Sequence, residues 1–303
     1  MTCLTPRWLR ATADPARPFR RVRMPSTLRP DLSCRHSEQI PAPRPGPRAA
    51  AILQRALRHC FSVGSAEFTL GSQQVGMPNI ERTILRYHNT LSADPYHRYR
   101  SWGHCYRYFR HRASLRERRD LDGSALQLAF YLASWGMYRG SAFLLQKDCR
   151  IHRLAVREVL RPRYDPLLAF RASSPRRTVG GIQEILALVS SIRDTYCNQI
   201  SRVNGRRCVV EVTDTLATKI LLATLACAPA YDAYVVEGLR TEGIPYSTLN
   251  ERTLKSLFDW YNDRRAAFDS IEDHIRENGV RYPPMKLVDM YLWEVGRRAS
   301  GER

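Results

Sequence analysis

Lysine is scarce in this chain of 303 amino acids, in which four Lys stand beside 44 Arg. A GC-rich bacterial genome produces such a ratio whether or not the protein needs arginine, so the formal net charge of +19 is only partly evidence for a polyanionic partner. Long apolar runs are also lacking. The longest, 125–137 and 220–231, are shorter than the roughly 18–20 residues that cross a bilayer, so we expect no membrane span.

Cysteine pairs and common catalytic motifs are missing too. The eight Cys include no C-x-x-C pair, and the closest two are eleven residues apart, which argues against a zinc ribbon or a compact disulfide framework. We therefore expect reduced, mostly buried thiols in a cytoplasmic protein, with no metal and no cofactor. The G-x-G-x-x-G, Walker A, H-E-x-x-H, G-x-S-x-G and H-R-D motifs are absent, which removes the sequence evidence for the enzymes that use them.

The chain changes character between Gly76 and Met77. Residues 1–76 contain twelve Arg, no Lys, four acidic residues and nine of the eighteen Pro. This composition predicts a disordered Arg/Pro-rich segment, since it cannot bury a core. Met77 is a candidate alternative translation start, in which case eight of the nineteen net positive charges would belong to a segment outside the translated protein.

From Met77 onward, apolar residues recur with helical spacing. We predict one all-α domain of about nine helices over residues 77–303. The segment 124–138 is apolar on nearly every face, which predicts a central, buried helix. The segment 173–181, with one Pro, two Arg and two Gly, predicts a basic loop. Thr248 and Glu251 have the spacing of a capping box at a helix start.

A predicted helix over residues 96–112 combines aromatic and basic side chains. One aromatic stripe comprises Tyr99, Trp102, Tyr106 and Phe109. A neighbouring basic face comprises Arg100, His104, Arg107 and His111. Aromatic rings beside cations are typical of surfaces that bind single-stranded nucleic acid. The alternative is an amphipathic helix with its aromatic side chains in the core and its basic face in water.

The polyanion-binding candidates extend beyond that face. The full set is Arg100, His104, Arg107, Arg110, His111, Arg176, Arg177, Arg206 and Arg207. A metal site on the same helix is excluded, because His97, His104 and His111 repeat every seven residues and lie about 10 Å apart along the axis.

Carboxylates in apolar surroundings are the candidates for acid–base chemistry. Asp289 lies in the run MKLVDMYLWEVG, five residues before Glu294, and Asp120 and Asp122 precede the apolar helix 124–138. A buried carboxylate with a raised pKa can act as a general acid or base. At a helix start, however, Asp is more often a cap.

One segment resembles a known family. Residues 215–239 form an apolar helix that carries Lys219, then a Pro, then Asp232 at the start of another helix. This order is similar to that in helix-hairpin-helix DNA glycosylases, although the Gly-rich hairpin and the four-Cys cluster of some members are absent. The resemblance implies that Asp232 assists base excision and that Lys219 is the nucleophile, the two lining a basic cleft.

Three hypotheses follow. The leading one is a non-catalytic, intracellular helical protein that contacts nucleic acid or another polyanion through Arg-rich faces. The second is an enzyme that acts on nucleic acid, with Asp232, Lys219 or Asp289 in its active site. The third is a plain protein-interaction domain, which would show a large exposed apolar patch.

Overall fold

The structure is a computed structural model that describes residues 79–140, 142–172, 174–203, 206–207, 209–277 and 279–301. The segment 1–76, predicted to be disordered, and Met77 lie outside the described residues. The prediction of an all-α domain is confirmed, because the described residues contain eleven α-helices and only two short β-hairpins. Within them, no helix combines the length and the apolar character that a membrane span requires.

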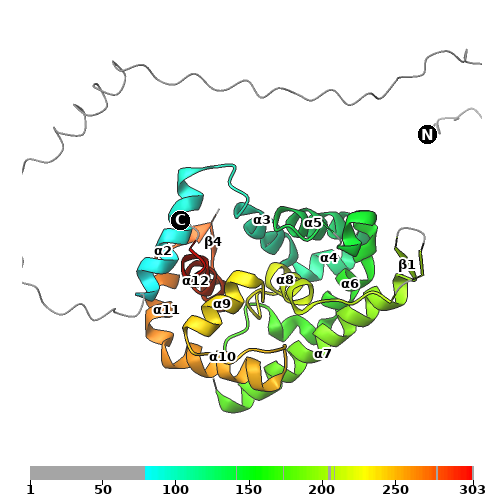
Figure 1. Ribbon diagram of the computed structural model, residues 1–303. Helices are drawn as coiled ribbons and strands as arrows, with labels where there is room; N and C mark the ends of the chain where they lie inside the picture. The colour runs from blue at the N-terminus through cyan, green and yellow to red at the C-terminus, as the bar shows by residue number, and fades with distance from the viewer. Residues whose placement is uncertain are drawn as a thin grey trace, which may run out of the picture. The chain divides into compact units, whose positions relative to one another are not determined.

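The central element is α12 (Pro284–Ala299), on which every residue from Pro284 to Gly296 is buried. Proline at its first position fixes the start of this helix. The helix α9 (Ala233–Thr241) packs directly against it (Figure 1). A Cβ atom on Gly238 would lie 2.1 Å from the carbonyl oxygen of Leu292, and one on Gly296 would lie 1.8 Å from that of Tyr234. Glycine at both positions therefore allows the close approach of the two backbones.

Most of the other helices form two groups near this pair, and the longest helix packs beside them (Figure 1). On one side of α12 lie α2 (Ile80–Ala93) and α11 (Arg265–Glu272). A second group packs together as α3 (Arg100–Phe109), α5 (Leu121–Ser134) and α8 (Asp214–Thr224). The longest helix, α7 (Pro175–Gln199), contacts α8, α6 (Arg153–Val159) and α10 (Glu251–Asp263).

Short elements complete the domain. The helix α4 (Arg112–Arg118) follows α3, and three 3-10 helices are η1 (Phe143–Gln146), η2 (Cys149–His152) and η3 (Pro162–Leu167). Strands β1 (Arg202–Val203) and β2 (Arg206–Arg207) pair antiparallel, as do β3 (Arg276–Glu277) and β4 (Val280–Arg281). Of the cysteines in the described residues, Cys105 and Cys227 are buried free thiols, Cys149 is half-buried and Cys197 is exposed.

The helix count exceeds the expected nine because two predicted helices are broken. The segment 96–112 becomes α3 and the start of α4, since the backbone of His111 leaves the helical region at φ −87° and ψ 49°. The second is the helix that begins near Thr248, which the apolar residues from Leu254 to Ile275 predict as continuous; Arg264, at φ −110° and ψ 10°, separates it into α10 and α11.

Three local predictions were wrong. The segment 124–138 is not central, because Leu126 and Phe130 on α5 are 56% and 60% exposed. Most of the segment 173–181 is the first two turns of α7, with Ser174 as the N-cap and Pro175 at the first position, a combination that starts helices. The capping box at Thr248 is not formed, since Asn250 is the N-cap of α10 and accepts a hydrogen bond from the Thr253 N–H.

Candidate functional site

Two lysines of the chain are buried, and each meets an aspartate. Lys219 on α8 is 3% exposed and Lys286 on α12 is 1% exposed. An isolated ammonium group in the interior is costly, so a buried lysine requires a charged partner. The aspartates that supply this partner are Asp232 and Asp289.

The first pair connects α12 to the segment before α9. Nζ of Lys286 lies 2.8 Å from Oδ2 of Asp289, one turn along the same helix. The other carboxylate oxygen, Oδ1, accepts a hydrogen bond from the backbone N–H of Ala230 at 3.0 Å. Both carboxylate oxygens of Asp289 therefore accept hydrogen bonds, one from the Lys286 ammonium and the other from the Ala230 N–H.

The second pair connects α8 to the start of α9. Nζ of Lys219 lies 2.9 Å from Oδ2 of Asp232. Oδ1 of Asp232 accepts a hydrogen bond from the Val235 N–H at 3.2 Å and so caps α9. The resemblance to helix-hairpin-helix DNA glycosylases implied that these two side chains line a basic cleft. The structure places them in contact but does not place them in such a cleft. Neither lines the main hollows of the described surface, and the side chains are only 4% and 17% exposed.

Trp135, the C-cap of α5, lies between the two pairs. Its ring centre is 4.9 Å from Nζ of Lys219 and 5.9 Å from Nζ of Lys286, within range of cation–π attraction. Arg98 reaches the same ring from the turn before α3, at 5.5 Å. The indole N–H of Trp135 is buried and has no hydrogen-bond partner among the described residues.

Stacked rings cover the two pairs. The half-buried ring of Tyr99 lies between those of Tyr87 and Trp135, with centroids 4.6 Å and 5.2 Å away and interplanar angles of 13° for both contacts. Burial, and after it the charge of Asp289, raises the pKa of Tyr87 and of Tyr131 well above the ordinary value of 10.0. Both phenols are therefore neutral in the folded protein.

The remaining carboxylate candidates have structural roles. Asp120 caps α5 through the Gly123 N–H at 2.8 Å, and Asp122 forms an ion pair with Arg153 at 3.1 Å. Glu294 is buried on α12 and forms an ion pair with Arg297 at 2.9 Å. A cap and two ion pairs explain these three residues without a catalytic role.

The polyanion-binding candidates on α3 and α4 divide into an inner and an outer set. Arg100 points back toward α2, where its guanidinium donates to the carbonyl oxygens of Leu91 and Asp94. His104, Arg110 and His111 are exposed, and half-buried Arg107 donates a hydrogen bond to Nδ1 of His104 at 3.1 Å. The aromatic stripe lies inside the protein. Trp102, Tyr106 and Phe109 are at most 5% exposed, so they cannot stack on bases. For these three, the structure favours the alternative in which the aromatic side chains belong to the core.

The other candidates lie elsewhere. Arg176 and Arg177 are exposed in the first turn of α7, and Arg206 and Arg207 form β2. Lys286 and Trp135 were not among the site residues predicted from the sequence. The signal available for Lys286 was its position three residues before Asp289 on an otherwise apolar helix, a spacing that allows a pair on one helix face. No sequence signal marked Trp135, because its neighbours come from α3, α8 and α12.

Among the described residues, no group of three or more His, Cys, Asp or Glu side chains is arranged to hold a metal ion. The chain matches no model of a known protein family, and searches of curated proteins and of solved structures find no match either. The function therefore has to be argued from the chain's own residues.

Proposed function

We propose that the protein binds nucleic acid or another polyanion, without catalysis, through the surface formed by α3, α4 and the turn before α3. The observation that supports this proposal best is the charge of the segment 97–119, which holds eight Arg and one acidic residue, Glu117. Among the described residues, carboxylates neutralise only two of these arginines, since Arg112 and Arg116 both contact Asp165, at 2.5 Å and 2.9 Å.

The other six arginines of the segment form no ion pair with any described residue. They are Arg98, Arg100, Arg107, Arg110, Arg118 and Arg119. Each exposed arginine that contacts a phosphate releases a condensed counterion, so a cluster of this kind binds polyanions with steep dependence on salt. Because the core takes up most of the aromatic stripe, the attraction is mainly electrostatic.

The test is a titration of binding to random-sequence DNA and RNA at increasing salt, measured by fluorescence anisotropy. Four phosphate contacts on duplex DNA would give a slope of log K against log salt of about −3.6. Arg107→Gln, Arg110→Gln, Arg118→Gln and Arg119→Gln should each reduce that slope by about one.

Arg276→Gln is the matched control, because it removes the same charge from the exposed strand β3. An equal loss in the control would show that net charge, not this surface, governs binding. Undetectable affinity at about 50 mM salt, where counterion release is most favourable, would refute the proposal.

A second candidate function is excision of a base from nucleic acid, which rests on the contact between Lys219 and Asp232. In helix-hairpin-helix glycosylases the lysine, where present, attacks the sugar carbon and the aspartate assists departure of the base. In this chain Asp232 already accepts a hydrogen bond from the ammonium of Lys219 and could take its proton. A substrate would reach the pair only if the rings around Trp135 move, because the Lys219 side chain is 4% exposed.

Borohydride trapping distinguishes this candidate from simple binding. The full chain would be incubated with DNA that contains an abasic site, and a covalent adduct that Lys219→Met abolishes would support it. The same variant should retain salt-dependent binding, since Lys219 does not lie on α3 or α4. If the variant forms as much adduct as the parent chain, Lys219 is not the nucleophile.

A further inference from the structure

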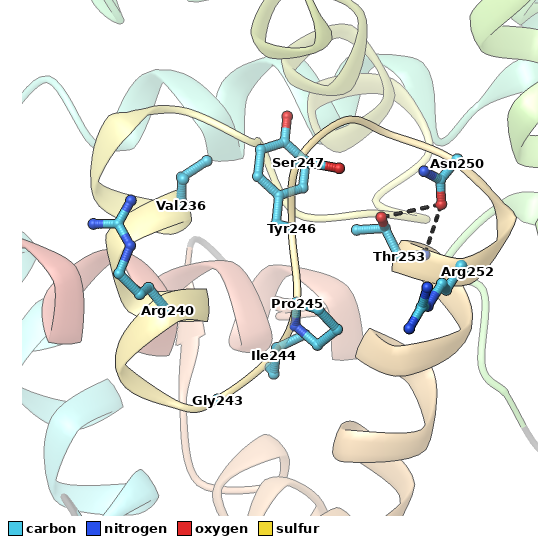
Figure 2. Close-up of a pocket in the computed structure, with 10 residues that line it drawn as sticks. All are labelled: Val236, Arg240, Gly243, Ile244, Pro245, Tyr246, Ser247, Asn250, Arg252 and Thr253. Carbon is cyan, nitrogen blue, oxygen red and sulfur yellow. Dashed lines mark hydrogen bonds between the residues drawn. The ribbon is translucent and has the colours of Figure 1, made fainter.

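A hollow of about 590 Å³ lies between α9 and α10, in a part of the molecule that the proposed function does not use (Figure 2). This volume falls in the range of sites that bind small molecules. The loop 243–247 forms its floor, and the ends of the two helices form its walls.

The charge of the hollow is positive. Arg240 from α9 and Arg252 from α10 stand on opposite walls (Figure 2). None of the described residues that line the hollow carries a carboxylate. Arg240 contacts Glu237 one turn earlier on its own helix, whereas Arg252 makes no ion pair with any described residue. The positive end of the α10 dipole lies at the wall that holds Arg252, where exposed Glu251 in the same first turn offsets part of this field.

The apolar part of the hollow is a wall made by Val236, Pro245 and the ring of Tyr246. The Tyr246 ring is held from behind by the ring of Tyr231, at 4.9 Å and an interplanar angle of 29°. A planar ring of a ligand can therefore contact a rigid aromatic and proline surface without displacing a side chain.

The floor is fixed before any ligand binds. Gly243 has φ +70°, which ends α9 and lets the Ile244 N–H donate to the carbonyl oxygen of Leu239 at 2.8 Å. Asp214 accepts hydrogen bonds from the Tyr246 hydroxyl at 2.8 Å and from the Leu249 N–H at 2.7 Å, which holds the C-terminal end of the loop and the residues that follow it. A preformed site loses little conformational entropy on binding.

We propose that this hollow binds a small organic anion with a planar ring, of the size of a mononucleotide. The phosphate lies between Arg240 and Arg252, and the ring lies against Pro245 and Tyr246. Guanidinium groups form charge-assisted hydrogen bonds with phosphate oxygens, and the apolar wall discriminates a nucleotide from inorganic phosphate.

The test measures the affinity of the full chain for adenosine 5′-monophosphate, adenosine and inorganic phosphate by isothermal titration calorimetry. We expect the nucleotide to bind at least tenfold more tightly than either fragment. Arg240→Gln and Arg252→Gln should each weaken nucleotide binding about tenfold, the effect of one charge-assisted hydrogen bond. Ser247→Trp should block the hollow without a change of charge, because Ser247 is exposed and lines it.

Arg276→Gln and Arg110→Gln serve as controls and should leave nucleotide binding unchanged, which also separates this site from the surface of α3 and α4. Circular dichroism on each variant confirms that the fold is retained. A nucleotide affinity equal to that of phosphate, an equal loss in the Arg276→Gln control, or no binding up to about 5 mM would each overturn the proposal.

A free mononucleotide and the terminal nucleotide of a strand offer the same chemistry. Competition by a 5′-phosphorylated oligonucleotide distinguishes them, since only a hollow that admits a strand end would release the nucleotide. Release of the nucleotide by the oligonucleotide, at the same oligonucleotide concentration in Arg110→Gln as in the parent chain, assigns the site to a strand end, and retention of the nucleotide assigns it to the free ligand.

Discussion

The pair Lys286–Asp289 allows the sharpest test of how this core is built. We consider Lys286→Met, which keeps the apolar part of the side chain, and Asp289→Asn, which keeps the shape of the carboxylate. Each single change leaves one buried charge without its partner. The double variant removes both charges and retains the oxygen that accepts the Ala230 N–H.

The magnitude follows from burial. The two side chains are 2% and 6% exposed and their charged atoms lie 2.8 Å apart, so neither charge gains hydration when the other is removed. Breaking such a pair costs about 3–5 kcal/mol, whereas replacing both members by neutral groups is often close to neutral. We expect each single variant to lose about 3–5 kcal/mol of unfolding free energy, and the double variant to lose less than either.

The assay is urea unfolding followed by circular dichroism and tryptophan fluorescence, which also reports on Trp102 beside the Lys286 ammonium. The pair Lys255–Asp259 on α10 is the matched control, with the same residue types at 2.6 Å but side chains that are 61% and 55% exposed. Its double-mutant cycle should give a coupling of at most about 0.5 kcal/mol.

Additive losses at Lys286 and Asp289, within about 0.5 kcal/mol, would refute the reasoning, because independent sites add and coupled ones do not. The reasoning would also be refuted if the coupling energy between Lys286 and Asp289 were as small as that between Lys255 and Asp259.

Three further predictions concern single positions. Gly296→Ala should cost about 3 kcal/mol or more, because its Cβ would lie 1.8 Å from the carbonyl oxygen of Tyr234; a thermal melt measures this. Burial lowers the pKa of His152 from 6.5 to about 3, so below pH 6.5 the unfolded chain binds a proton that the folded chain does not. The unfolding free energy should therefore fall by about 1.4 kcal/mol per pH unit from pH 6.5 towards pH 3, and His152→Leu should lack this slope in urea titrations. Tyr96 is 93% exposed beside the basic surface, so Tyr96→Ala should weaken binding to single-stranded more than to duplex DNA, by about 1–3 kcal/mol, in the same anisotropy assay.

Helix starts were predicted best where one residue type decides them. Asp232 caps α9 through the Val235 N–H, as its position at the start of an apolar segment indicated. Such a cap involves only residues up to three positions apart, so it can be recognised from the sequence. The basic loop at 173–181 was wrong because two glycines were weighted above the Ser-Pro start of α7.

The identity of the central helix could not be predicted from hydrophobicity. The apolar helix α5 has an exposed face, whereas the buried helix α12 carries Lys286, Asp289 and Glu294. These charges made α12 look amphipathic. They are tolerated in the interior because each meets an opposite charge three residues away on its own helix, and that compensation is visible only once the packing is known.

The segment 96–112 was interpreted either as a nucleic-acid-binding surface or as an amphipathic helix with its aromatic side chains in the core. In α3, the buried aromatic face and the exposed basic face are two sides of the same helix. Trp102 donates its indole N–H to the carbonyl oxygen of Leu222 at 3.0 Å, which fixes the aromatic face of α3 against α8. The opposite face then has to be polar to remain hydrated, and it carries His104, Arg107 and Arg110. A helix anchored by its rings cannot offer those rings to bases. If α3 binds nucleic acid, it does so through phosphates, with steep salt dependence and little sequence preference.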